Sequence, residues 1–273
     1  MIPLFRKIRK EMADDNKPLQ YMKYAIGEIA LVVIGILIAL QINNWDLKKQ
    51  QQENIKENAK LLIQDLEEDI LEVELNIAVI TEISTKIDSL AISVHNRKIE
   101  DISNIDFLYL TWNVLYRPYI WNRTTFNQLE NSGNLQYIEN VSITKKISSY
   151  YAFTEHMDGD YLNDKSKSEH ALQLISQVVN SNYSNIRELR RNVLVNTNNP
   201  EMIGFYYYKQ PDYLKAKAQN LNLITNEIND VNKVISSLTR LQSYYHIRSE
   251  WELPELIKDA KEIIMLLKEE YYE

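Results

Sequence analysis

The feature that most constrains this chain is Ile29 to Leu40, a run of 12 residues that is apolar at every position. Extended to Tyr24 and Ile42, it has about 19 residues and makes about 28 Å of helix, which matches a bilayer core of roughly 30 Å. A core helix of a soluble protein seldom stays apolar on every face for so long. A cleaved signal peptide is disfavoured because no A-x-A site follows the run. The sequence therefore predicts an uncleaved transmembrane helix at residues 24–42.

Basic residues are concentrated on one side of this span. Residues 1–23 form a basic tail, and after the span only Lys48 and Lys49 come before an acidic setting. Because Lys and Arg stay on the cytoplasmic side, we expect a cytoplasmic N-terminus and a main domain in the periplasm, beyond a bacterial inner membrane. Tyr24 and Trp45 bracket the span as interfacial anchors. The tail residues expected to contact anionic lipid are Arg6, Lys7, Arg9 and Lys10.

Four residues inside the span differ from its aliphatic background. Gly35 and Ala39, with Gly27 two turns earlier, have the small side chains that let membrane helices approach closely. Glu28 is an acid at membrane depth, where a carboxylate is costly. It either reaches the headgroups, for example toward Lys23, or serves as a proton or ion site.

Composition and periodicity predict an all-α protein. The chain has 5 Gly and 6 Pro, few for its length, and none from Ile36 to Arg117. Residues 43–100 predict one long helix with an apolar stripe, broken by a stutter between Leu66 and Ile70. Asn43-Asn44 is the expected place for a break between this helix and the span, since Asn is a poor helix former. The stripe positions are Ile55, Ala59, Leu62, Leu66, Ile70, Val73, Ile77 and Ile80, and then Ile87, Ala91 and Val94.

Residues 101–273 are expected to complete an extracytoplasmic antiparallel helical bundle on the long helix. A second stripe begins at Leu214, runs through Leu221 to Tyr245, and is followed by a final helix with Pro254 in its first turn. The segment between the stripes predicts helices over 106–116, 124–133, 143–157 and 164–179. Gly133 and Asp158-Gly159 are the expected stops of the second and third of these helices. Residues 180–199 predict a loop with a basic helical turn at 186–191, and 205–208 is the one strand candidate.

The sequence contains no recognisable catalytic, cofactor-binding or metal-binding motif. There is no cysteine, no phosphate loop, and no pair of histidines at a spacing of three or four residues. A net charge of −7 disfavours a nucleic-acid partner. The acidic runs Glu67 to Asp69 and Glu269-Glu270 predict solvated helix faces. The pairs Tyr150-Tyr151, Tyr244-Tyr245 and Tyr271-Tyr272 predict half-buried packing.

Two segments resemble an uncharacterised family of single-span membrane proteins from Bacteroidota, catalogued as a domain of unknown function. The first is the span, with Gly27-Glu28 before it and Gln41-Ile42-Asn43-Asn44-Trp45 after it, together with Phe5 to Arg9 upstream. The second runs from Thr125 through Ser132-Gly133 to Tyr150-Tyr151. The resemblance implies near full-length coverage and the same topology. It implies no activity, cofactor or catalytic residue.

These features favour an anchored helical scaffold or interaction protein over an enzyme. Its expected partners are membrane lipid, a second copy of the chain, and another membrane or periplasmic protein. Two alternatives stay open. One is a component of an ion- or proton-coupled membrane complex that uses Glu28, and the other is an extracytoplasmic sensor.

Overall fold

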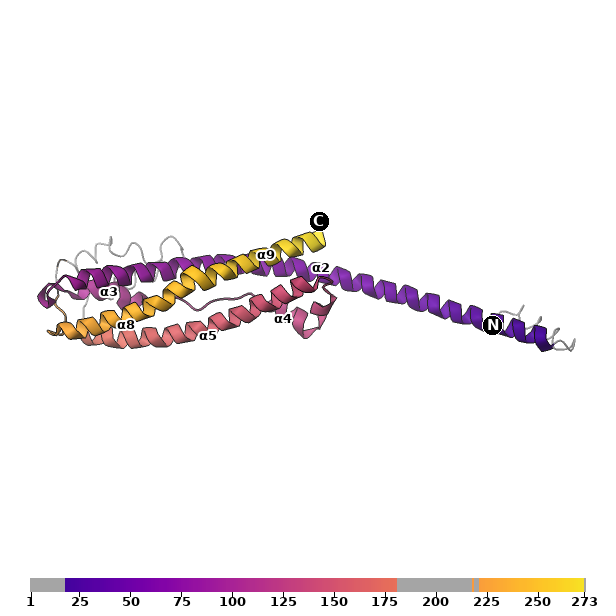
Figure 1. Cartoon of the computed structure of the whole chain (residues 1–273), viewed down its shortest axis with the longest axis horizontal. Coiled ribbons are helices and arrows are strands. Elements are labelled where there is room, and N and C mark those ends of the chain that lie inside the picture. The colour runs from indigo at the N-terminus through magenta and orange to yellow at the C-terminus, as the bar shows by residue number, and fades with distance from the viewer. Residues whose placement is uncertain (1–17, 181–217, 219–220, 273) are drawn as a thin grey trace. The chain divides into compact units, whose positions relative to one another are not determined.

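The computed structural model describes residues 18–180, 218 and 221–272, which fall into two compact units, 1–57 and 58–273. The described residues contain no β-strand, only an isolated bridge between Ser103 and Asn222, so the predicted all-α fold is confirmed (Figure 1). Several expectations lie outside the described residues: the basic tail positions Arg6, Lys7, Arg9 and Lys10, the position Leu214, the helical turn at 186–191, and the strand candidate at 205–208.

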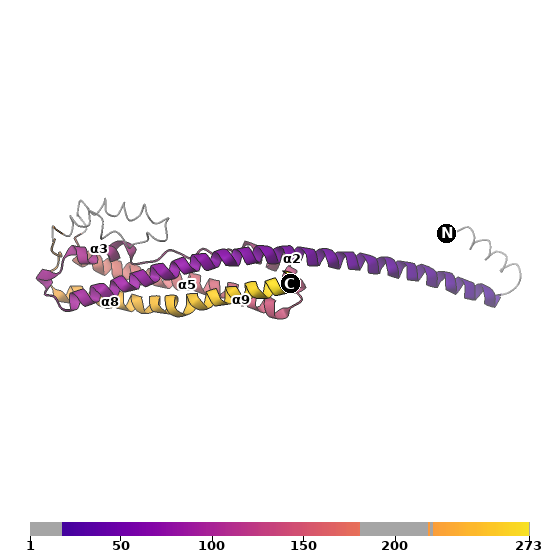
Figure 2. The ribbon, with the colours of Figure 1, turned by 90° about the horizontal axis from the view of Figure 1, so that it is seen from above.

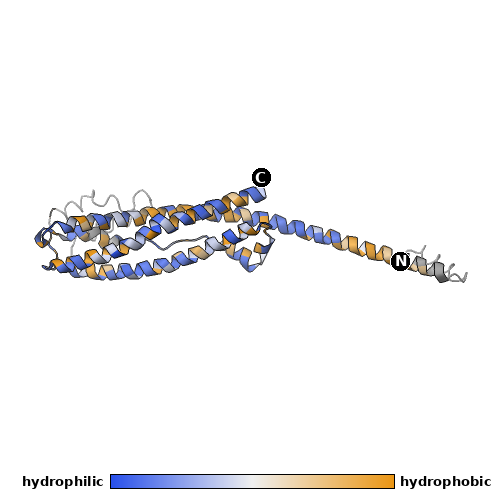
Figure 3. Cartoon of the chain, viewed as in Figure 1, coloured by the Kyte–Doolittle hydropathy of each residue, from blue (hydrophilic) through white to orange (hydrophobic). Residues whose placement is uncertain are grey.

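The described part of the first unit is helical throughout. It belongs to helix α2 (Pro18–His95), which passes through Asn43 and Asn44 without a break. The low helix propensity of two Asn residues costs only about 1 kcal/mol together, so it does not interrupt a helix this long. The apolar stretch from residue 25 (Figure 3) is long and apolar enough to cross a membrane. None of its most apolar window is buried by the described residues.

The second unit is built on three long helical segments. They are the part of α2 after residue 57, α5 (Val141–Val178), and a C-terminal segment made of α8 (Ile228–Ile247), η5 (Arg248–Glu252) and α9 (Leu253–Tyr272). The C-terminal segment contacts Ser84 through Gln242 and Glu67 through Lys268, so it runs antiparallel to α2, as predicted. Lys146 of α5 pairs with Glu262, while later residues of α5 pair with Arg248. The C-terminal segment is therefore antiparallel to α5 as well (Figures 1 and 2).

The buried side chains of α2 follow a strict heptad, which corrects the predicted stutter. The apolar positions Ile70 and Ile77 lie at the edge of the core, and the polar residues Asp69 and Asn76 occupy the core positions beside them. Spacings of four and three then alternate without interruption, which keeps one seam facing the partner helices. The seam positions are Ile55, Ala59, Leu62, Leu66, Asp69, Val73, Asn76, Ile80, Ile83, Ile87, Leu90 and Val94, and Ile63, Glu82 and Ser84 are buried beside the seam.

Helix α5 does not stop at Asp158-Gly159, where the sequence predicted its end. One interior glycine costs about 1 kcal/mol, whereas burying one Leu- or Met-sized side chain contributes about 1.5–3 kcal/mol. Core positions continue past Gly159 at Asp164, Ala171 and Ile175, so ending the helix would expose them. The Asp158 side chain accepts bonds from Trp121 and Arg123 instead of ending the helix.

The C-terminal segment begins later than predicted, because Leu221 lies outside it. The Leu221 carbonyl accepts from the Asn104 amide, and the Ile224 amide donates to Val178, so this stretch is held by other elements. Within the segment, the buried positions Tyr245 and Leu253 are eight residues apart, one more than a heptad. The π-helical turn η5 absorbs that residue through a bond from the Leu253 amide to the Arg248 carbonyl.

Four short elements link α2 to α5. They are η1 (Ile99–Asp101), α3 (Asn104–Asn113), α4 (Thr124–Asn131) and η2 (Asn134–Tyr137). Gly133 has a φ of 69°, a left-handed conformation that favours glycine, so its predicted role as the stop of α4 is confirmed. The N-cap of α4 is Arg123.

Candidate functional site

Two groups of polar residues, each centred on buried charged side chains, interrupt the apolar core of the second unit. We call the first the Asp69 cluster, formed by Asp69, Asn122 and Tyr150. We call the second the Arg248 cluster, formed by Tyr116, His156, Asp160, Asp164, Arg248 and Glu252. Each lies where a heptad position carries a charged residue, so each needs partners that compensate for lost hydration.

The Asp69 cluster holds one carboxylate between two neutral donors. The backbone N–H of Asn122 donates to Oδ1 of Asp69 at 2.8 Å, and the Tyr150 hydroxyl donates to Oδ2 at 3.0 Å. Burial raises the pKa of Asp69 above its ordinary value of 3.8, although both hydrogen bonds oppose this shift. The prediction that Glu67 to Asp69 form a solvated face is therefore wrong for Asp69, whereas Glu67 and Glu68 are exposed.

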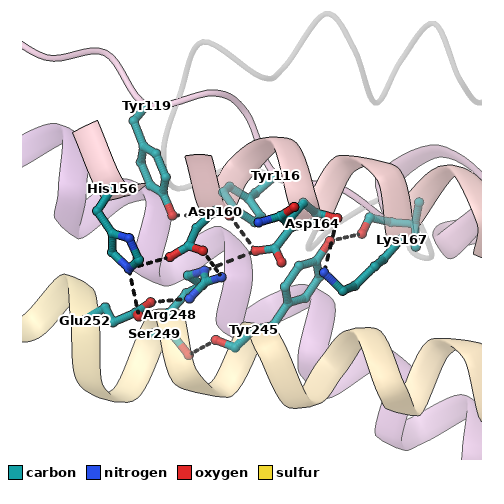
Figure 4. Close-up of polar contacts among 12 residues, drawn as sticks. Tyr116, Tyr119, His156, Asp160, Asp164, Lys167, Tyr245, Arg248, Ser249 and Glu252 are labelled. Atoms are coloured by element: carbon teal, nitrogen blue, oxygen red, sulfur yellow. Dashed lines mark hydrogen bonds and ion pairs between the residues drawn. The ribbon is translucent and has the colours of Figure 1, made fainter. Parts of the chain in front are cut away.

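The Arg248 cluster depends on the π turn. Because η5 holds one extra residue, Arg248 and Ser249 are both buried there. The Ser249 hydroxyl donates a hydrogen bond to the Tyr245 carbonyl at 2.9 Å, whereas the Arg248 side chain extends to α5. Glu252 is the last residue of η5, four residues after Arg248, and its carboxylate lies beside the guanidinium (Figure 4).

The Arg248 guanidinium contacts three carboxylates. Its Nε lies 3.2 Å from Oδ2 of Asp164, its Nη2 lies 3.1 Å from Oδ1 of Asp160, and its Nη1 donates to Oε2 of Glu252. Asp160 and Asp164 are one turn apart on α5, so the arginine bridges two like charges on one helix (Figure 4). Its hydrogen bond to Glu252 and the nearby carboxylates raise the pKa of Arg248, against the opposing effect of burial.

Tyrosines close the buried side of this cluster. The Tyr116 hydroxyl donates to Oδ2 of Asp164 at 2.9 Å and accepts from the Tyr119 hydroxyl at 3.2 Å. The Tyr245 ring meets the Tyr116 ring edge-on, and its hydroxyl donates to the Val114 carbonyl at 2.6 Å. Burial raises the pKa of Tyr116 well above its usual range, so this hydroxyl stays a neutral donor. Tyr150, Tyr151 and Tyr245 are fully buried, so the predicted half-burial is wrong for them, whereas Tyr244 is half-buried and Tyr272 is exposed.

Asp164 is fully buried, and only one of its oxygens is hydrogen-bonded. Oδ2 receives both Tyr116 and Arg248, while Oδ1 is buried without a hydrogen-bond partner. Burial raises the pKa of this carboxyl, and the Arg248 charge opposes the shift. The positive charge of Lys167 also opposes the shift.

The solvent side of the cluster carries His156. Its Nε2 lies 3.1 Å from Oδ2 of Asp160 and 3.9 Å from Oε1 of Glu252. One imidazole nitrogen and two carboxylate oxygens are a donor set that can hold a cation. Sequence analysis missed this group because the predicted helix stop at Asp158-Gly159 would have separated His156 from Asp160. The spacing of four residues between them was the available signal.

The predicted site residues of the span belong to α2 in the first unit, and none of them is a member of either cluster; Gly27, Gly35 and Ala39 are exposed and Glu28 is half-buried. A Cβ atom added at Gly27 or Gly35 would meet nothing within 4 Å. At about 100° per residue, Glu28, Gly35 and Ala39 share one face within about 40°, whereas Gly27 is turned about 80° from Gly35. Gly27 therefore belongs to a neighbouring face.

Of the two predicted interfacial anchors, Tyr24 and Trp45, the structure describes the side chain of Trp45 only. Trp45 is exposed on α2, with 68 % of its surface accessible, as an interfacial residue would need to be. The side chain of Tyr24 lies outside the described residues.

No family model, no curated protein and no solved structure matches this chain. The resemblance to a Bacteroidota membrane-protein family therefore stays a prediction.

Proposed function

We propose that the protein is a membrane-anchored helical scaffold whose bundle holds a partner near a bacterial inner membrane, on the periplasmic side. The observation that carries the proposal is the apolar stretch of α2, which no other described residue covers. Exposed apolar area of this extent requires lipid or protein around it. The polar groups of the bundle core pair mostly with one another, as expected of a structural element.

The topology has a direct test, because the chain contains no cysteine. Ser89 is exposed on α2, so Ser89→Cys provides a single labelling site in the second unit. We expect a membrane-impermeant maleimide to label this variant in spheroplasts, with the protein in the inner-membrane fraction. Labelling that needs lysis, or a protein that stays in the soluble fraction, would overturn the proposed topology.

The proposal includes self-association through the span. Apolar side chains alone give membrane helices no reason to associate, since lipid tails are equally apolar. Gly35 and Ala39 allow close backbone approach, and Glu28 lies on the same face. If protonated, Glu28 can donate a hydrogen bond across the contact, a contribution of about 1 kcal/mol.

Two glycine variants, one on the proposed contact face and one beside it, test this interface. Gly35→Leu fills the proposed contact face, whereas the matched control Gly27→Leu places the same side chain on a neighbouring face. A Cβ at either position meets no other group among the described residues, so both variants should fold. We expect light scattering in mild detergent to give an oligomer for wild type and Gly27→Leu and a smaller species for Gly35→Leu. A monomeric wild type would exclude self-association.

The scaffold proposal also requires a partner. Crosslinking in native membranes followed by mass spectrometry should recover a second copy of the chain or another membrane or periplasmic protein. An ion- or proton-coupled complex around Glu28 is the second candidate, favoured by the shared face with Gly35 and Ala39. It would be distinguished by loss of function in Glu28→Gln with crosslinked partners unchanged.

A further inference from the structure

Three side chains from two helical segments bring their donor atoms together on the surface of the bundle. His156 and Asp160 come from α5, and Glu252 comes from η5 (Figure 4). Their Nε2, Oδ2 and Oε1 atoms all lie within 4.8 Å of one another. In a tetrahedral zinc site with bonds of about 2.0–2.2 Å, the donor atoms are about 3.3–3.6 Å apart. The distances of 3.1 and 3.9 Å from His156 Nε2 bracket that range.

The second oxygen of each carboxylate is already held. Arg248 binds Oδ1 of Asp160 at 3.1 Å and donates to Oε2 of Glu252. Metal-binding carboxylates usually have such outer hydrogen bonds, which fix the free oxygen toward the ion. Because Arg248 is buried and tied to Asp164 as well, it positions both carboxylates without contacting the proposed ion.

One carboxylate oxygen of the cluster also leaves room for a cation. Arg248 contacts Asp160, Asp164 and Glu252 through their other oxygens, and Lys167 acts on Asp164 as a second positive charge. Oδ2 of Asp160 is buried and accepts no well-oriented hydrogen bond, although it faces Nε2 of His156. Nε2 of His156 can meet this oxygen in two ways, either as an N–H donor or as a lone pair that binds the same metal ion.

We propose that His156, Asp160 and Glu252 bind one divalent first-row transition-metal ion, with zinc as the first choice, and that Arg248 is a positioning residue. An imidazole among the donors favours zinc over calcium or magnesium, which prefer oxygen donors. The His156 side chain is 56 % exposed, so an ion can enter from solvent. The bound ion joins α5 to the C-terminal segment across the π turn and keeps a position open for water or a ligand atom of a partner.

The test uses the full-length protein in detergent, purified without a polyhistidine tag and stripped of metal. Titration calorimetry with zinc chloride should give one ion per chain, and zinc should raise the melting temperature by mass action. Calcium should do neither. His156→Ala and Glu252→Gln should each weaken zinc binding by about tenfold or more. Cobalt should give the visible absorption of a four-coordinate site in wild type and lose it in His156→Ala.

His246→Ala is the matched control. His246 also pairs with a carboxylate four residues away, at 2.8 Å from Glu250, but on the described surface this pair has no second carboxylate. We expect this variant to bind zinc like wild type. The proposal fails if wild type binds no zinc, in which case a proton bridges His156 and Asp160. It also fails if His156→Ala binds zinc as tightly as wild type, or if His246→Ala loses as much affinity.

Discussion

The Asp69 cluster and the Arg248 cluster compensate for buried carboxylates in different ways. Asp69 has one donor for each oxygen, and both donors are neutral. In the Arg248 cluster three carboxylates share one guanidinium, and two of their oxygens have no hydrogen-bond partner. A satisfied buried group needs nothing further from its surroundings, whereas an unsatisfied group is where a ligand or ion can act. The difference separates a structural polar contact from a candidate site.

The largest expected effect comes from removing the shared cation. Arg248→Met leaves Asp160, Asp164 and Glu252 without their guanidinium, and breaking a buried ion pair costs about 3–5 kcal/mol. We expect the free energy of unfolding, measured by urea titration in detergent, to fall by about that much. The control is Lys146→Met, which breaks a partly exposed pair with Glu262 and should cost about 0.2–1 kcal/mol. Similar losses in the two variants would mean that Arg248 does not hold the cluster together.

A medium effect should distinguish the two hydroxyl donors. Tyr150→Phe removes one of the two donors to Asp69, and an unsatisfied buried acceptor costs about 1–3 kcal/mol. Tyr116→Phe, compared in a Tyr119→Phe background so that no second hydroxyl loses its acceptor, should cost less, because Oδ2 of Asp164 keeps its bond to Arg248. Thermal unfolding of both variants, followed by circular dichroism, measures the order. A greater loss of thermal stability in Tyr116→Phe than in Tyr150→Phe would contradict the view that the Asp69 cluster depends on its neutral donors.

The smallest expected effect is the pH dependence contributed by Asp69. Its pKa is raised in the folded chain, so the folded state binds more protons than the unfolded state between 3.8 and the folded pKa. Stability contributed by this group is therefore present below pH 3.8 and is lost as the pH rises through that window. Asp69→Asn removes the loss, since an amide does not titrate.

This pH effect is measured as a difference between two proteins. Relative to wild type, Asp69→Asn should be more destabilised near pH 4 than near pH 7. Urea titrations of both proteins across that range give the comparison. A difference that does not change with pH, or that changes with the opposite sign, would show that burial does not raise the pKa of Asp69.

Both clusters also show where sequence reasoning stopped. Local periodicity predicts apolar residues in the core, so it placed Ile70 in the seam and left Asp69 in solvent. Asp69 is buried because Asn122 and Tyr150 reach it from other elements, 53 and 81 residues away in the chain. The Arg248 cluster was missed because Asp158-Gly159 predicted the end of a helix. In the structure, core positions further along α5 outweigh this local stop signal, and the helix continues.

The sequence alone determined the features that depend on local pattern. The apolar run at residues 24–42, the scarcity of glycine and proline, and the heptad spacing predict helices and one candidate span, because each acts through neighbouring residues. The turn at Gly133 belongs to the same class, since only a local backbone conformation requires it. Tertiary structure decided which polar residues enter the core, and it decided that α5 continues past Asp158-Gly159. It also decided that His156 and Glu252 meet across two helices, because burial energy and hydrogen-bond partners come from segments far apart in the chain.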